Sequence, residues 1–166
     1  MNKENASKLK NKLISILGDD DSKEIYEDND FILISQDDDW VFEYRGDFRS
    51  VSEESSPFNF TMEGKGKVTK IPKKREDMMI TYEGDFVNNN IKKGTWKLTV
   101  NDLVEGKYEG EFNKEREFHG EGCLTIYIKD GKVNKKGQRT CGTFAKSKLI
   151  KEKNKINNFF NKFFKQ

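Results

Sequence analysis

A five-residue motif, Tyr-x-Gly-x-Phe, recurs along the chain and constrains its fold more than any other feature. It reads YRGDF from Tyr44, YEGDF from Tyr82 and YEGEF from Tyr108, and a weaker copy, TCGTF, begins at Thr140. The central glycines of successive copies lie 38, 26 and 32 residues apart. Such a short unit cannot bury its apolar side alone, so the recurrence predicts a stack of similar units.

Each unit is expected to form a β-hairpin. Side chains alternate along a strand, so Tyr82, Gly84 and Phe86 should face one way. The asparagines at 88–90 suit a tight turn, because Asn tolerates left-handed backbone geometry. A lone hairpin is only marginally stable, so neighbouring units must pack together. Alternate residues of the returning strand should likewise lie on opposite faces, Gly94, Trp96, Leu98 and Val100 on one and Thr95, Lys97 and Thr99 on the other.

The composition agrees with a thin core built from aromatic rings. Only 33% of the 166 residues are hydrophobic and 36% are charged, yet the chain contains 13 Phe. This length suffices for one ordinary domain. The predicted fold class is therefore mainly β, an elongated array of antiparallel hairpins with a short amphipathic helix at each end. We expect a ring from a neighbouring unit to lie over Gly84 and over Gly110.

Three segments are predicted. Residues 1–43 contain an amphipathic helix from Ala6 to Gly18, an acidic loop, and a hairpin of FILIS (31–35) and WVFEY (40–44). Residues 44–145 contain the repeats. Residues 146–166 are expected to form a basic amphipathic helix that caps the array, binds a protein partner or lies on a membrane surface. Its candidate partner- or lipid-binding residues are Lys151, Lys155, Phe159, Phe160, Lys162, Phe163 and Phe164.

The charges are divided strongly between the two ends. Between Asp19 and Glu43 there are eleven acidic side chains and one lysine, and between Lys146 and Gln166 there are seven lysines and one glutamate. Each end should therefore attract a different partner. The basic residues are not interleaved along an exposed sheet face, so nucleic acid is not expected as a partner.

No motif for catalysis, a cofactor or a metal is found. The single histidine, His119, has no clustered cysteines, so a zinc site is not expected. The aspartate runs 19–21 and 37–39 lack the spacing of a calcium loop. Cys123 and Cys141 are expected to be inert thiols, with a redox pair of the two as the minority alternative. No phosphate loop or nucleophile elbow occurs. We expect a protein that is not an enzyme, with no cofactor and no small-molecule substrate.

The sequence resembles MORN repeat proteins, whose unit is Tyr-x-Gly-x-Phe or Tyr, a turn and a His-Gly-x-Gly element. EFHGEG at 117–122 is the best match to that element, MEGKG at 62–66 keeps both glycines, and KKGTW at 92–96 keeps only Gly94. The likeness covers Tyr44 to Phe144. Its motif and candidate groove residues are Tyr44, Gly46, Phe48, Tyr82, Gly84, Phe86, Trp96, Tyr108, Gly110, Phe112, His119, Gly120 and Gly122.

What the resemblance implies is a non-enzymatic scaffold or adaptor. MORN repeat proteins serve in cytoskeletal assemblies, including ciliary and axonemal complexes, and at membrane-apposed junctions. Some carry a lipid kinase or methyltransferase domain, for which the flanks here are too short. Without a signal-peptide or transmembrane pattern we expect a cytoplasmic, cytoskeleton- or cilium-associated protein, with the mitochondrion as a minority alternative. The runner-up function is a peripheral membrane protein that binds anionic lipid or phosphoinositide through the repeats and the basic end.

Overall fold

The computed structural model describes residues 6–27, 30–50, 60–75, 77–129 and 132–152. One helix, α1 (Ala6–Leu17), precedes all of the strands. The strands are β1 (Ser22–Glu27), β2 (Asp30–Gln36), β3 (Trp40–Ser50), β4 (Phe60–Pro72), β5 (Met78–Val87), β6 (Asn90–Val100), β7 (Leu103–Phe112), β8 (Phe118–Lys129), β9 (Lys132–Ala145) and β10 (Lys148–Glu152).

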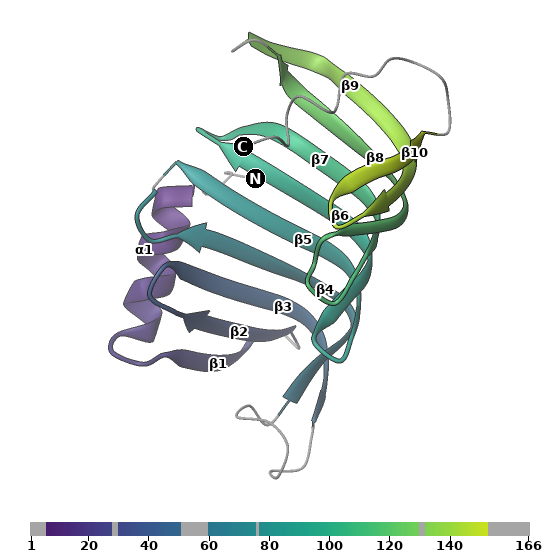
Figure 1. Cartoon of the computed structure of the whole chain (residues 1–166). Coiled ribbons are helices and arrows are strands. Elements are labelled where there is room, and N and C mark those ends of the chain that lie inside the picture. Colours follow the sequence, from purple (N-terminus) through teal and green to yellow (C-terminus); the bar gives the residue numbers. More distant parts are fainter. Residues whose placement is uncertain (1–5, 28–29, 51–59, 76, 130–131, 153–166) are drawn as a thin grey trace.

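The ten strands form a single antiparallel sheet in the order of the chain (Figure 1). Each strand therefore pairs with the strand that follows it, as in a run of hairpins. The predicted mainly-β class and the predicted hairpin of 31–35 and 40–44 are confirmed. β3 continues through the boundary predicted after Glu43, so the leading hairpin and the first motif belong to one sheet.

Two-residue turns join several of these strands. Asn88 and Asn89, between β5 and β6, both have positive φ, and so do Asn101 and Asp102 between β6 and β7. This combination is typical of the type I′ turn, whose twist matches that of the strands it joins. The prediction of a turn at Asn88–Asn90 is therefore confirmed, although Asn90 itself begins β6.

The motif glycines line up across the sheet. Gly46 lies opposite Gly66, and the row continues directly through paired glycines to β9 (Gly84, Gly94, Gly110, Gly122, Gly142). Several strand pairs shift their register beside this row, which is the mark of a β-bulge. Because glycine has no side chain, the paired backbones approach closely there: a Cβ on Gly84 would lie 2.6 Å from the Cα of Gly94.

The sheet folds over along this glycine row. Tyr108 and Phe112 are four residues apart on β7 and would be about 13 Å apart on a flat strand. Their ring centroids are only 5.3 Å apart. The strand therefore bends at Gly110 toward the face that carries the rings, and that face is the concave side of a trough, as the curved strands in Figure 1 show.

The helix covers part of the opposite, convex face. Leu13 and Leu17 of α1 are buried against Ile32, Ile34 and Val41 of β2 and β3. The helix ends as predicted, because Gly18 takes a positive φ and its N–H donates to the carbonyl of Ile14 at 2.9 Å. The helical prediction for Ala6–Gly18 is thus confirmed to within its final residue.

Three predictions are wrong. The acidic loop expected after the helix contains strand β1, which pairs with β2 through Ile25 and Ile32. The C-terminal helix expected from Lys146 begins instead with a turn and strand β10, because Leu149 packs against the aromatic core from an edge strand. Cys123 and Cys141 are joined in a disulfide, since the β8–β9 register places them opposite each other with Cα atoms 4.0 Å apart.

Candidate partner-binding trough

A row of large side chains runs across the concave face next to the glycine row. Tyr108 lies opposite both Trp96 and Leu124, and Tyr82 lies opposite Val68 and Trp96. The row crosses six neighbouring strands, because the register is continuous from β3 to β8 (Tyr44, Val68, Tyr82, Trp96, Tyr108, Leu124). All of these side chains belong to the main hydrophobic core or pack against it.

The motif tyrosines contact the motif phenylalanines two strands further on. Ring centroids are 5.6 Å apart for Tyr44 and Phe86, 5.9 Å for Tyr82 and Phe112, and 5.2 Å for Tyr108 and Phe144. All three pairs meet edge to face, the geometry that the ring quadrupole favours. Each Tyr-x-Gly-x-Phe copy therefore contacts the next copy in the same way.

The hydroxyls of Tyr44 and Tyr108 form hydrogen bonds with backbone carbonyls at the bend. The Tyr108 hydroxyl lies 3.1 Å from the carbonyl oxygens of both Glu111 and His119, and the Tyr44 hydroxyl donates to the carbonyl of Asp47. Burial, reinforced by nearby carboxylates, raises the pKa of Tyr44 and of Tyr108 to about 12. Both hydroxyls therefore remain protonated and able to donate at neutral pH.

Two glycines lie directly under these rings. A Cβ on Gly66 would come within 2.5 Å of the Tyr44 ring, and one on Gly122 within 2.4 Å of the Tyr108 ring. The prediction that rings from a neighbouring unit cover Gly84 and Gly110 is wrong: the covered glycines are Gly66 and Gly122, and each ring comes from the other strand of the same hairpin. Gly84 faces the backbone of β6, and Gly110 faces the hydroxyl of Tyr108 on its own strand together with the backbone of Gly122.

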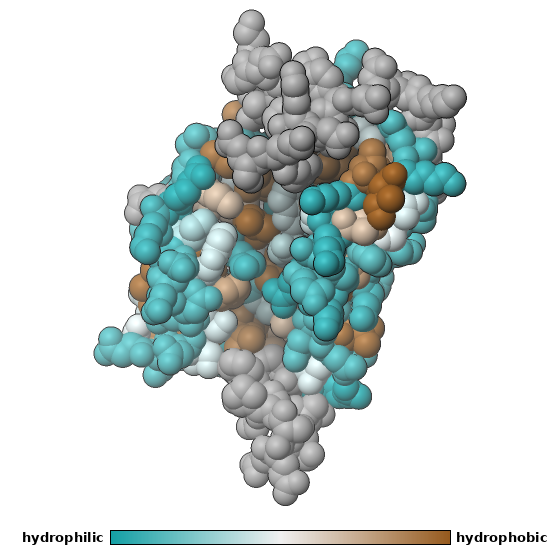
Figure 2. All heavy atoms as spheres, in the orientation of Figure 1, coloured by the Kyte–Doolittle hydropathy of each residue, from teal (hydrophilic) through white to brown (hydrophobic). Residues whose placement is uncertain are grey.

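A second row on the concave face is only half-buried. Phe42 lies opposite Lys70, which lies opposite Ile80, and Ile80 in turn lies opposite Leu98. Figure 2 shows the result as a hollow with apolar atoms on its floor and hydrophilic ridges on either side. The sequence interpretation did not select these residues as candidate groove positions, although each lies two residues from a motif aromatic or its partner on the same strand.

One end of this trough contains two cations. Arg116, in the β7–β8 turn, lines a hollow of about 290 Å³ together with apolar side chains (Leu33, Phe42, Tyr44, Met62, Val68). Its guanidinium donates to the carbonyl of Asn89 at 3.3 Å. The Lys70 ammonium lies 4.6 Å from the centroid of the Trp40 ring and 5.0 Å from that of Phe42. No ion pair joins either cation to a carboxylate in the described part of the chain.

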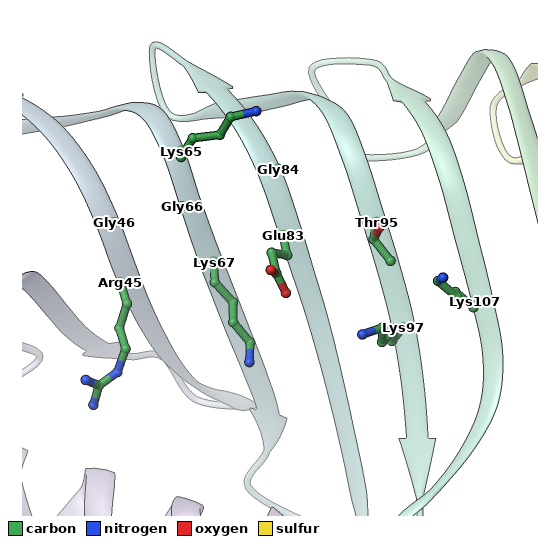
Figure 3. A pocket seen from close by; sticks show the side chains of 10 residues that line it. All are labelled: Arg45, Gly46, Lys65, Gly66, Lys67, Glu83, Gly84, Thr95, Lys97 and Lys107. Carbon is green, nitrogen blue, oxygen red and sulfur yellow. The ribbon is translucent and has the colours of Figure 1, made fainter.

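The convex face carries a second hollow, of about 530 Å³, beyond the helix. Basic side chains from neighbouring strands surround it with Glu83 and Thr95, as Figure 3 shows (Arg45, Lys65, Lys67, Lys97, Lys107). Arg45 pairs with Glu43 at 3.0 Å, Lys65 with Asp85 at 2.5 Å and Lys107 with Glu109 at 2.7 Å. Lys67 and Lys97 form no ion pair with another described residue.

The predicted motif residues fall into three groups. Tyr44, Phe86, Tyr108 and Phe112 are buried core residues, and the glycines form the bend. Tyr82 and Trp96 are half-buried on the trough side, and Phe48 is 38% exposed. The His119 side chain is exposed to solvent, and its backbone carbonyl accepts a hydrogen bond from the Tyr108 hydroxyl. Lys151 is exposed on β10; Lys155, Phe159, Phe160, Lys162, Phe163 and Phe164 lie outside the described residues.

Neither a cluster of metal ligands nor a membrane-spanning helix occurs among the described residues. Among the described residues, no three His, Cys, Asp or Glu side chains are grouped so that they could hold a metal ion. The carboxylate of Asp37 instead accepts the N–H groups of Asp39 and Trp40, at 2.9 and 2.7 Å, and so forms the β2–β3 turn. No helix within the described ranges is long and apolar enough to cross a membrane.

The chain matches no protein-family model, no curated protein and no solved structure.

Proposed function

We propose that this chain is a non-enzymatic scaffold or adaptor that binds protein partners in the trough of a MORN-like repeat sheet. The repeated contact between a motif tyrosine and the phenylalanine of the next copy supports this assignment of the fold. The proposal places the protein in a larger assembly, such as a cytoskeletal or ciliary complex. The amphipathic helix remains a prediction for residues 153–166.

The observation that carries the proposal is the half-buried apolar row on the concave face. Phe42, Ile80 and Leu98 are half-buried on the concave face, and Figure 2 shows a hollow with apolar atoms on its floor on that side of the molecule. A contiguous apolar surface framed by polar residues is typical of a protein-binding site. Small side chains of the partner would fill the trough, and hydrophilic ridges would form the rim of the interface.

A matched pair of variants on β5 tests this proposal. Ile80→Ser changes the trough, and Thr81→Ala changes the neighbouring residue, which faces the convex side. Some proteins are expected to co-purify with the intact chain from its native cells. We expect the amount of these proteins to be at least tenfold lower for Ile80→Ser and unchanged for Thr81→Ala. Thermal melts of both variants check that the sheet stays folded. An unchanged set of partners with folded Ile80→Ser would contradict the proposal.

The second candidate function is binding of an anionic membrane surface. The basic hollow on the convex face favours it, because Lys67 and Lys97 are charged and are not engaged in ion pairs with described residues. Lysines near an anionic bilayer each contribute roughly 1 kcal/mol of attraction. Co-sedimentation with phosphatidylserine vesicles, lost in a Lys67→Gln and Lys97→Gln double variant, would support this function. Equal sedimentation of the double variant and the intact chain would contradict it.

A further inference from the structure

We infer that the end of the trough between Lys70 and Arg116 binds an acidic segment of a protein partner, with a carboxylate between the two cations and an apolar side chain in the adjoining hollow. This inference rests on the proposed function and names the chemistry of the partner. Its basis is the placement of two cations beside a hollow that is lined mainly by apolar and aromatic side chains.

Two separate parts of the chain hold the two charges at this end of the trough. Lys70 is half-buried in the second row, between Phe42 on β3 and Ile80 on β5, with its ammonium against the Trp40 ring. Arg116 comes from a different part of the chain, 46 positions further on, and contacts the β5–β6 turn at Asn89. Both sets of contacts hold the cations on the same side of the sheet as the apolar row.

The charges of Lys70 and Arg116 are incompletely compensated by the described carboxylates. Burial lowers the pKa of Lys70, and the nearby Arg116 charge lowers it further; Asp37 acts weakly in the opposite direction. Burial also lowers the pKa of Arg116. Glu43 also borders the hollow, but its side chain faces the convex side, where its carboxylate pairs with Arg45 at 3.0 Å. A carboxylate of the partner would favour the charged forms of Lys70 and Arg116 and would reduce the repulsion between these two cations.

The turn that carries Arg116 is held by its own hydrogen bonds before any partner binds. The side chain of Asn113 accepts the N–H of Glu117 at 2.9 Å and donates to the Glu117 carboxylate at 2.7 Å. The N–H of Arg116 donates to the Asn113 carbonyl at 3.0 Å, and Arg116 has a positive φ of 62°. A cation held in place loses little conformational entropy on binding.

The size of the hollow also limits the ligand. About 290 Å³ is at the lower limit of the roughly 300–1,000 Å³ of small-molecule and cofactor sites. The hollow is therefore suited to a side chain or two of an extended peptide. The basic segment at residues 153–166 carries the wrong charge to satisfy Lys70 and Arg116.

The test is fluorescence anisotropy of the full chain with labelled peptides of alternating leucine and glutamate, glutamine or lysine. We expect the glutamate peptide to bind at least tenfold more tightly than the other two, and this preference to be lost in Arg116→Gln and in Lys70→Met. Arg139→Gln is the control, because Arg139 pairs with Glu109 on the convex face. Thermal melts check that each variant remains folded.

Several results would overturn the inference. If the glutamine or lysine peptide binds as tightly as the glutamate peptide, and Ile80→Ser abolishes that binding, the trough binds peptides but the acidic preference is wrong. If no peptide binds, the acidic-segment inference fails, whatever the co-purification result. Arg116-dependent binding of phosphatidylserine vesicles, Arg116-dependent self-association, or tighter binding of a peptide copy of residues 153–166 would each assign this surface to another occupant.

Discussion

The ring of Tyr108 lies directly over Gly122 on the neighbouring strand, so a Cβ at position 122 would come within 2.4 Å of the ring. The ring cannot move aside, because Tyr108 is fully buried and stacks on Phe118 with a centroid distance of 4.0 Å. This relationship explains why the motif alternates rings with glycines. The ring on one strand of a hairpin fills the space that the missing side chain leaves on the other strand of the same hairpin.

Gly122→Ala should therefore destabilise the fold by about 3 kcal/mol or more, because overpacking a buried site forces side chains and backbone to shift. Gly18→Ala is the matched control. Gly18 has a φ of +60° but nothing within 4 Å of its Cβ position, so only the left-handed backbone penalty of about 1–2 kcal/mol applies. Chemical denaturation of both variants measures the difference. Equal losses would show that Tyr108 does not restrict residue 122.

Tyr108→Phe should destabilise the fold by about 0.5–1.5 kcal/mol, the net value of an ordinary hydrogen bond. The ring contacts with Phe118 and Phe144 remain, and only the donor to the carbonyls of Glu111 and His119 is removed. Urea unfolding measures the change. A variant as stable as the intact chain would show that the hydroxyl does not hold the bend.

The same tyrosine predicts a dependence of stability on alkaline pH. Its pKa is about 12 in the folded chain and 10.0 ordinarily, so folding favours the protonated form. The resulting stabilisation is complete below pH 10 and is lost as the pH rises from about 10 through 12. Unfolding curves at pH 9 and pH 11 should show a smaller loss of stability for Tyr108→Phe than for the intact chain. Lysine titration is common to both proteins and cancels in the comparison.

The turn at Asn101 and Asp102 offers a stabilising substitution. Both residues have positive φ, and Asn-Gly is the preferred pair for a two-residue turn of this kind. Asp102→Gly should therefore raise the free energy of unfolding by up to about 1 kcal/mol, while Asp102→Ala should lower it. Thermal melts of the two variants distinguish them. A stabilising effect of alanine would contradict the assigned turn geometry.

The disulfide should also contribute measurably. Cys123 and Cys141 are 18 residues apart, and closing a loop of this length in the unfolded chain stabilises the native state by about 3 kcal/mol in the entropic description. Reduction with dithiothreitol should lower the melting temperature of the intact chain and leave a Cys123→Ser and Cys141→Ser variant unchanged. An intact chain that melts identically with and without reductant would contradict this contribution.

The fold class could be predicted because the alternation of Tyr, Gly and Phe is a local property of each strand. The face assignments of Trp96 and Lys97 follow from the same period of two. The register between hairpins could not be predicted from the sequence, because it depends on contacts between residues far apart in the chain. For the same reason the pairing of Cys123 with Cys141 and the strand at Lys148–Glu152 could not be predicted. The position of Arg116 in the trough could not be predicted either, because it depends on the contact between the β7–β8 turn and Asn89 in the β5–β6 turn.

Neighbouring residues on β6 allow the most direct test of the proposed function. Leu98 lies in the trough and Lys97 lines the hollow of the convex face, so a photo-crosslinking amino acid can be placed at either position in otherwise identical chains. The account predicts that, in native cells, position 98 crosslinks to a discrete protein partner and position 97 does not. Crosslinks to that partner from position 97 alone, or to lipid at both positions, would contradict it.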